Sequence, residues 1–327
     1  MRLRGRLATT TAGVVLSLAM AAGLSGCMTV HGEKAVVPAA TQEEAEAALE
    51  HYVEINNQAK RDYDAEQNDE IEVGPLGAID GAGLTARAAE SPIGDPDFEP
   101  LQLGDTQFHI PQQAGWPKFF IADTKPSGLE NRWLMVFTRN SVEEDWRVSY
   151  LATLPAEQVP EFAEDGDGYL EDIPVDGDAG DDLAVPPAEL GTAYADYLQH
   201  GQGPFTEGPF TSDVLAEREQ ANSDAASLMQ YRDSAAEEEK FAPLAVRTED
   251  GGALVFFTVH HDSQETLAPD ETFELNPQVE ALLETNGTPE HSLTLHRLAI
   301  KTARVPAGDG PVEVLSEVQG LISAEGR

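Results

Sequence analysis

The chain contains one cysteine, Cys27, in 327 residues, and this limits how its fold can be held together. A single thiol forms no disulfide within one chain, and it cannot supply the several thiolates of a multi-cysteine zinc site. Apolar residues make up 41% of the sequence, which is enough to bury substantial cores in a chain of this length. We therefore expect a fold stabilised by apolar packing without internal crosslinks.

The segment in front of Cys27 has the pattern of a secretory signal. Three arginines in the first six residues precede Leu7 to Gly26, twenty residues without a charge. Leu24, Ser25, Gly26 and Cys27 resemble the lipobox of bacterial lipoproteins at all four positions. The resemblance implies a diacylglycerol on the Cys27 sulfur, cleavage before Cys27, and an anchor on the extracytoplasmic face of the cell membrane. A spanning helix and an ordinary signal with a chance cysteine are the alternatives.

Acidic residues outnumber basic ones by 59 to 20, which gives a formal net charge of −39. Residues 1–26 carry three arginines and no acid, so the remainder has a net charge of −42. Such a surface repels nucleic acid and anionic lipid headgroups, and we expect no nucleic-acid partner. Solubility in a crowded envelope is the simpler explanation of the charge, and recognition of a cationic ligand is the alternative.

The first half of the chain is expected to be a signal (1–26), a tether (27–40) and a first domain (41–155). Thr41 and Glu44 form a capping-box pattern, and an apolar stripe at helical spacing continues to about residue 64. Residues 70–97 are rich in Gly and Pro and predict loop with one short helix over 84–89. Strands are predicted at 117–123, 132–139 and 145–154, the last from ten residues of apolar and polar alternation.

Residues 156–187 are expected to be an acidic linker, followed by a second domain at 188–327. No Lys or Arg occurs from Val148 to Glu217, where sixteen acids do. The second domain is predicted to open with helices over 189–199 and 213–232. Its predicted strands form two hairpins, and their ranges are 241–248, 253–261, 293–305 and 312–323.

Each half runs from helix to antiparallel strands, which predicts an α+β fold of two domains, each with helices on a curved, cone-like sheet. Stretches such as HGEKAVVPAAT, EVGPLGAID, GWPKFFIADT, NRWLMVFTRNS and RTEDGGALVFFTV resemble a family of actinobacterial lipoproteins that has no assigned activity. The order of elements is also similar to that of cone-shaped domains of the nuclear transport factor 2 and ketosteroid isomerase type. That second similarity concerns the fold, and function does not follow from it.

Aromatic residues gather in the first predicted domain and suggest a pocket there. In a cone they would line a cavity with a histidine that either acts as a base or bonds a local backbone group. Filling of the core is the alternative explanation of the aromatic rings. The pocket residues are His109, Trp116, Phe120, Trp133, Trp146 and Tyr150.

The remaining acidic and histidine clusters do not have the spacing of a metal site, and the sequence motifs of common cofactor sites do not occur. We therefore expect neither a cofactor nor a metal. With Gly168 at the sixth position of a calcium loop, Ala163 and Pro174 occupy the positions that need an acid and a Glu. His260 and His261 are neighbours on a predicted strand and point to opposite faces, as do His291 and His296 on another. The sequence has no G-x-S-x-G elbow, phosphate loop or G-x-G-x-x-G after a strand.

These observations favour a lipid-anchored envelope protein that acts as a non-enzymatic binding or interaction module. Its partner, a protein or a small molecule, is not specified by the sequence. The alternatives are a small-molecule enzyme with an acid–base site in a cone-shaped pocket, and a passive structural protein of the envelope.

Overall fold

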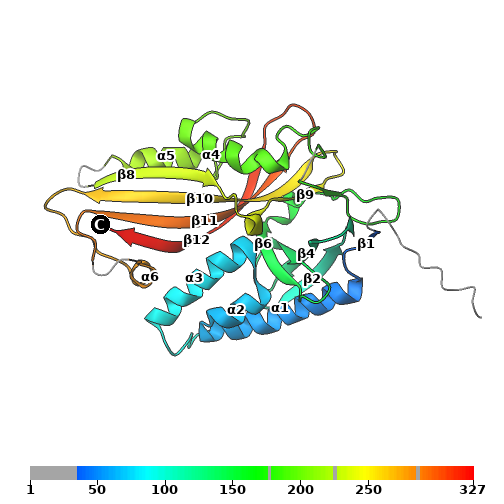
Figure 1. Ribbon diagram of the computed structural model, residues 1–327, viewed down its shortest axis with the longest axis horizontal. Coiled ribbons are helices and arrows are strands. Elements are labelled where there is room, and N and C mark those ends of the chain that lie inside the picture. Colours follow the sequence, from blue (N-terminus) through cyan, green and yellow to red (C-terminus); the bar gives the residue numbers. More distant parts are fainter. Residues whose placement is uncertain (1–34, 176–177, 224–226, 285–287) are drawn as a thin grey trace, which may run out of the picture. The chain divides into compact units, whose positions relative to one another are not determined.

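The computed structural model describes residues 35–175, 178–223, 227–284 and 288–327, and Val36–Arg327 form one compact unit (Figure 1). The helices are α1 (Gln42–Asp62), α2 (Ala65–Ile71), α3 (Gly74–Glu90), α4 (Leu190–His200), α5 (Ser212–Ala221) and α6 (Pro277–Ala281). The strands are β1 (Val36–Pro38), β2 (Leu103–His109), β3 (Gln112–Ala114), β4 (Lys118–Pro126), β5 (Arg132–Arg139), β6 (Arg147–Leu154), β7 (Asp172–Ile173), β8 (Ser227–Ala235), β9 (Leu244–Arg247), β10 (Ala253–Leu267), β11 (Ser292–Val305) and β12 (Glu313–Gly326). The described strands thus form a six-stranded sheet, a four-stranded sheet and the pair β1–β3.

Helix α1 begins with the capping box that the sequence predicts. The Thr41 hydroxyl accepts a hydrogen bond from the Glu44 backbone N–H at 3.1 Å, and the Glu44 carboxylate accepts one from the Thr41 N–H at 2.8 Å. The apolar stripe of the helix, with Leu49 and Tyr52 among its members, is buried against the four-stranded sheet. The helix ends at Tyr63, whose φ of 53° is left-handed.

Helix α3 is longer than the sequence predicted. It covers Gly74–Glu90, whereas residues 70–97 were expected to be loop with one short helix over 84–89. Pro75 lies in the first turn, where a missing N–H costs nothing. Gly74 has a φ of +62°, and a Cβ there would lie 2.8 Å from the Lys240 carbonyl oxygen, so the helix start requires glycine. Burial of Leu76 and Leu84 then outweighs the poor helix propensity of the glycines.

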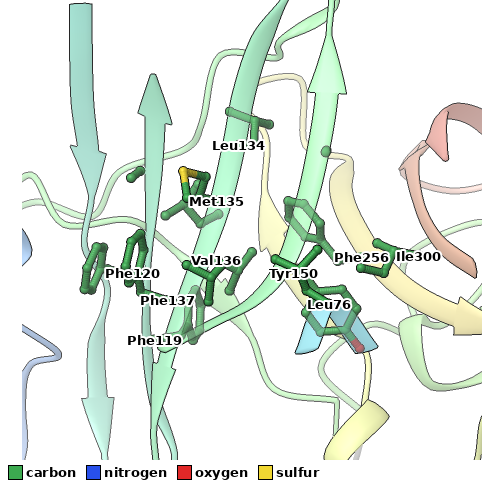
Figure 2. Packing of buried hydrophobic residues seen from close by; sticks show 14 of the residues in the cluster. Leu76, Phe119, Phe120, Leu134, Met135, Val136, Phe137, Tyr150, Phe256 and Ile300 are labelled. Carbon is green, nitrogen blue, oxygen red and sulfur yellow. The ribbon is translucent and has the colours of Figure 1, made fainter. Parts of the chain in front are cut away.

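The four-stranded sheet has the order β2-β4-β5-β6 and is antiparallel throughout. The predicted alternation of β6 is confirmed, since Val148, Tyr150, Ala152 and Leu154 are all buried. The rings of Phe120 and Phe137, on neighbouring strands, stack at 4.8 Å and 7° and fill the middle of this core (Figure 2).

The six-stranded sheet has the order β12-β11-β10-β9-β7, with β8 pairing with β10 beyond the end of β9. Both faces are covered. Leu254 and Phe256 of β10 belong to the core shared with α3 and the four-stranded sheet, whereas Val255 and Phe257 face a second core under α4. In Figure 1, α4 and α5 lie on one side of this sheet and α3 on the other. The predicted α+β class with antiparallel sheets is confirmed, and the cone-like arrangement is not.

The helix predicted over 213–232 is wrong in its second half. Helix α5 ends at Ala221, and Ser227–Ala235 form β8, which pairs with β10 from Ser227↔Leu267 to Ala235↔Val259. Pairing with a long neighbouring strand overrides the local helical spacing, because strand formation depends on the partner surface.

The predicted division into two domains with an acidic linker is not confirmed. Apolar residues of 156–187 are buried, and β7 within this segment pairs with β9. Arg247 of β9 holds the Asp182 carboxylate through two hydrogen bonds of 2.7 and 2.9 Å. The two halves also share one apolar core, to which Tyr150 and Phe256 both belong. The segment is therefore packed against the six-stranded sheet.

Candidate functional site

The structure distributes the six predicted pocket residues over the core and the surface of the four-stranded sheet. Phe120 and Trp146 meet edge to face at 4.8 Å inside the core, and Trp133 packs half-buried at its margin. Tyr150 is buried and donates its hydroxyl hydrogen to the carbonyl oxygens of Phe241 and Ala242, at 3.0 and 2.9 Å. His109 packs against Phe162 of the same core, Trp116 is exposed, and none of the six lines either of the two clefts described below.

His109 ends β2, half-buried, with its ring centroid 4.5 Å from that of Phe162. Burial, followed by the positive charge of Arg132, lowers the pKa of His109 to about 4. The imidazole is therefore neutral at pH 7. Its Nε2 is buried without a hydrogen-bond partner among the described residues.

A network of buried charges lies elsewhere, between α4, α5 and the six-stranded sheet. The Asp233 carboxylate accepts two hydrogen bonds from the Arg218 guanidinium, at 2.6 and 2.8 Å. Asp233 Oδ1 also lies 2.5 Å from His261 Nδ1. Burial acts to raise the pKa of Asp233, but the hydrogen bonds and charges of Arg218 and His261 outweigh it and lower that pKa to about 2. Asp233 is therefore ionised at neutral pH.

The second ion pair of the network joins Lys301 to Glu317. The Lys301 ammonium, on a residue only 1% exposed, hydrogen-bonds to the Glu317 carboxylate and lies 4.9 Å from the centroid of the Tyr194 ring. Burial lowers the pKa of Lys301, against the opposing effect of Glu317. Burial, Glu317 and Asp233 raise the pKa of Tyr194, whose hydroxyl donates to the Phe210 carbonyl oxygen at 2.5 Å.

Strand register accounts for the positions of these groups. Asp233 of β8 is the cross-strand partner of His261 of β10, and Lys301 of β11 is the partner of Glu317 of β12. All four therefore lie on the sheet face that α4 covers. Gly191 lets α4 approach this face closely, since a Cβ there would lie 3.3 Å from the Ala235 Cβ.

A cleft of about 700 Å³ opens beside the network, between α4 and β8. Its volume falls within the range of small-molecule sites. Four carboxylates line it together with two hydroxyl groups, so its charge favours a cationic ligand. The lining residues are Thr192, Ala195, Asp196, Asp233, Ser234, Ala235, Glu237 and Glu238.

A smaller cleft of about 310 Å³ lies between β1, β3 and the acidic segment. Asp172, in its lining, accepts a hydrogen bond from the Gln113 amide at 3.0 Å. Burial raises the pKa of Asp172. Three acids line this cleft and four line the larger one, and the two clefts share no lining residue.

The Asp233–His261 pair has the geometry that orients an imidazole in many acid–base sites. In the part of the chain that the structure describes, however, no Ser, Thr or Cys hydrogen-bonds to the other ring nitrogen of His261. In each of the two ion pairs, the positive and the negative group neutralise one another within a largely buried interface. The arrangement is suited to fixing α4 and α5 on the sheet and to shaping the wall of the adjacent cleft.

A separate buried acid, Glu72, lies between α2 and α3. Its carboxylate accepts hydrogen bonds from the Tyr52 hydroxyl at 3.0 Å and the Asn68 amide at 2.9 Å. Burial, and then the negative charge of Asp80, raise the pKa of Glu72 to about 8. Glu72 therefore holds a proton at neutral pH, unlike Asp233.

His260 and His261 lie on opposite faces of β10, as the strand period predicts, whereas His291 precedes β11 and the prediction that it shares a strand with His296 is wrong. His261 faces Asp233, whereas His260 faces Glu238 on the opposite side, at 3.5 Å. His296 binds Asp262 through its Nδ1 at 2.9 Å, and His291 is exposed. Over the described ranges, no group of three or more His, Cys, Asp or Glu side chains is placed to hold a metal ion.

The charge network is not predicted by the sequence, because its members are far apart in the chain. One local signal was available. Lys301 interrupts an apolar strand on the same face as Ala299 and Ala303, where an unpaired charge would be costly.

The predicted anchor residues Leu24, Ser25, Gly26 and Cys27 lie outside the described residues. Among the helices that are described, none is both long enough and apolar enough to cross a bilayer.

The chain is similar to several lipoproteins of Streptomyces. It is 44% identical to an uncharacterised lipoprotein of Streptomyces coelicolor over 303 residues, which cover 92% of this chain and 91% of the relative. It is 41% identical to an uncharacterised lipoprotein of Streptomyces avermitilis over 330 residues, 100% of this chain and 97% of the relative. A further uncharacterised lipoprotein of Streptomyces coelicolor is 25% identical over 301 residues, 88% of this chain and 83% of the relative.

No solved structure matches the chain, and the expected similarity to nuclear transport factor 2-like domains is not confirmed. A family model does match, over residues 36–326, which is nearly all of the compact unit. The chain belongs to the family described as "Domain of unknown function (DUF8094)", whose Streptomyces relatives are lipoproteins.

Proposed function

We propose that this protein is held on the extracytoplasmic face of the cell membrane by a diacylglycerol on Cys27, with residues 1–26 removed as a signal. The match of Leu24 to Cys27 with a lipobox, in a family whose relatives are lipoproteins, carries this proposal. The tether, predicted at 27–40, is then shortened to residues 28–35, because β1 begins at Val36 and Ala39 and Ala40 are buried in the compact unit. Two acyl chains give a stable anchor without a spanning helix.

The anchor predicts a simple outcome when the thiol is removed. In cells that make the Cys27→Ala chain, the protein keeps residues 1–26 and takes up no radiolabelled palmitate. The Ser25→Ala chain is the matched control, since it preserves a small residue at that position and the thiol. Equal palmitate labelling of the Cys27→Ala and unaltered chains would rule the anchor out.

The role of the anchored unit is binding, and the cleft between α4 and β8 is the site that the geometry favours. Its volume suits a small molecule, and the buried network around Asp233 fixes one wall. Carboxylates of Asp196, Glu237 and Glu238 line the opening, so the expected ligand carries positive charge. No chemical step is assigned to the cleft.

A thermal-shift series tests the binding role. Polyamines and amino sugars are added at low ionic strength, and a cationic ligand of the cleft raises the melting temperature in proportion to the logarithm of its concentration. The shift is smaller in Asp196→Asn and Glu237→Gln and unchanged in Glu54→Gln, which removes the same charge from exposed α1. Equal shifts in all three variants would mean non-specific binding to an acidic surface. No shift with any cation would favour a passive envelope protein.

A further inference from the structure

Exposed apolar side chains concentrate where the chain enters the compact unit. Four of the seven large hydrophobic side chains that are exposed in the described ranges belong to this corner of the molecule. They are Val36 (59% exposed), Val37 (44%), Trp116 (41%) and Val142 (70%). These four residues are called the tether corner below.

Strand pairing brings the tether corner together. Val36 and Val37 belong to β1, which pairs with β3 through Val36↔Ala114, two residues before Trp116. Lys118 is the cross-strand partner of Arg139, so the chain before β4 and the loop after β5, which carries Val142, lie at the same end of the sheet. The Lys118 ammonium donates to the Val37 carbonyl oxygen at 3.3 Å, which ties β1 to this end.

Trp116 is held in place although it is exposed. The Arg139 guanidinium lies 5.4 Å from the centroid of its ring and 4.4 Å from that of Trp146, between the two indoles. The Lys118 ammonium lies 5.8 Å from the Trp116 ring. Ordered, exposed tryptophan with cations beside it is typical of side chains that lie at a membrane interface.

The length of the tether keeps this corner near the membrane. Eight residues separate Cys27 from Val36, so even a fully extended tether spans only about 30 Å. A compact unit of this size has a radius of gyration of about 19 Å. Even when extended, the tether is thus shorter than the diameter of the compact unit. The tether corner is therefore the part of the unit that lies nearest the bilayer.

We propose that the tether corner inserts into the headgroup region of the bilayer that holds the anchor, and so fixes the orientation of the compact unit. This inference rests on the proposed anchoring at Cys27. Glu143, Glu144 and Asp145 follow Val142 directly, so anionic lipids add little attraction, and the contact is made by the apolar groups and the indole. The partner is the interface of a phospholipid bilayer, whatever its headgroup charge.

Quenching by brominated lipids tests the contact. Acylated protein is reconstituted into phosphatidylcholine vesicles with or without bromine on the acyl chains, and tryptophan emission is compared. We expect brominated lipid to reduce the emission of the unaltered chain and of Trp133→Phe, and to leave that of Trp116→Phe unchanged. Equal quenching in all three proteins, or none in the unaltered chain, overturns the proposal.

A second pair of variants removes apolar contact without touching an indole. Val142→Asp lowers the quenching of Trp116, whereas Leu129→Asp, at the opposite end of β4 and β5, leaves it unchanged. Quenching that occurs only with anionic phosphatidylglycerol and disappears in high salt would make the contact electrostatic, and would also overturn the proposal.

Failure of the anchor and failure of the contact are separable. The mass of the N-terminal peptide of each preparation reports the acyl chains directly. If Cys27 carries none, a maleimide phospholipid is coupled to this single cysteine of the chain beginning at residue 27, and the same emission comparison is made. The contact is then tested on its own, with the same criteria.

Discussion

The Arg218 guanidinium and the Asp233 carboxylate form a two-point ion pair, at 2.6 and 2.8 Å, in which the Asp233 side chain has no exposed surface. Arg218 belongs to α5, a helix without a fully buried residue, and Asp233 belongs to β8. Val214 and Leu215 of α5 pack partly buried against the second core, and the Arg218–Asp233 pair adds a charged link between that helix and the sheet.

Replacement of Arg218 should therefore destabilise the whole unit. Arg218→Met leaves Asp233 buried beside His261 without its main cation, and we expect the free energy of unfolding to fall by about 3 kcal/mol. Urea denaturation followed by circular dichroism measures the change. Arg232→Met is the matched control, because Arg232 pairs with Asp262 with 76% of its side chain exposed, and its loss should cost under about 1 kcal/mol. Equal costs for the two variants would show that the network is not a structural centre.

Glu72 should make the protein less stable as the pH rises. Its pKa is about 8 in the folded state against 4.5 ordinarily, so the folded chain keeps a proton that the unfolded chain releases. The contribution of Glu72 to stability is complete below about pH 4.5 and is lost as the pH rises to about 8. Glu72→Gln keeps the shape without the charge and should flatten this part of the stability profile. A profile unchanged by the substitution would contradict the buried, protonated state.

His109 should make the protein less stable as the pH falls, over a pH range that overlaps the range of Glu72. Its folded pKa of about 4 lies below the ordinary 6.5, so the folded state favours the neutral ring. This contribution is complete above about pH 6.5 and is lost as the pH falls toward 4. Titration of the His109 ring protons by NMR measures the pKa directly. A midpoint near 6.5 would mean that the ring is solvated and that neither burial nor Arg132 acts on it.

The capping box at the start of α1 provides a local test of the fold. Thr41→Ala removes the hydroxyl that accepts from the Glu44 N–H and should cost about 1 kcal/mol. Thr41→Ser retains the acceptor and should be close to neutral. Thermal unfolding of the two variants compares them, and a loss of stability in Thr41→Ser as large as in Thr41→Ala would exclude the cap as the cause.

The elements that the sequence predicted well are those with strong local patterns. Three examples are the capping box at Thr41, the alternation of β6 and the turn between the strands predicted at 241–248 and 253–261. Each depends on residues close together in the chain. Helix α5 and β8 were predicted as one helix because Leu228 and Met229 also fit a helical stripe. The pairing of β8 with β10 is what makes Ser227–Ala235 a strand and not a helix. The paired residues are about 30 positions apart in the chain, so no local pattern predicts the pairing.

The candidate site was less predictable than the fold. The network consists of five residues from five elements: Arg218, Asp233, His261, Lys301 and Glu317. The register of four strands places the last four on one face of the sheet, and Arg218 reaches Asp233 from α5. The aromatic residues were visible in the sequence, but spacing alone does not distinguish a lined pocket from a filled core. Their stacking shows that Phe120 and Trp146 fill the core. The proposed anchor, by contrast, depends on four consecutive residues, so it is predicted without reference to the fold.

The proposed lipid on Cys27 underlies both the anchoring and the membrane contact, and the mass of the native N-terminal peptide tests it most directly. Protein is extracted from membranes of producing cells, digested and analysed for the peptide that begins at residue 27. We expect Cys27 at the N-terminus with the added mass of a diacylglyceryl group. An N-terminus at any other residue, or a Cys27 peptide without added acyl mass, would contradict the claim.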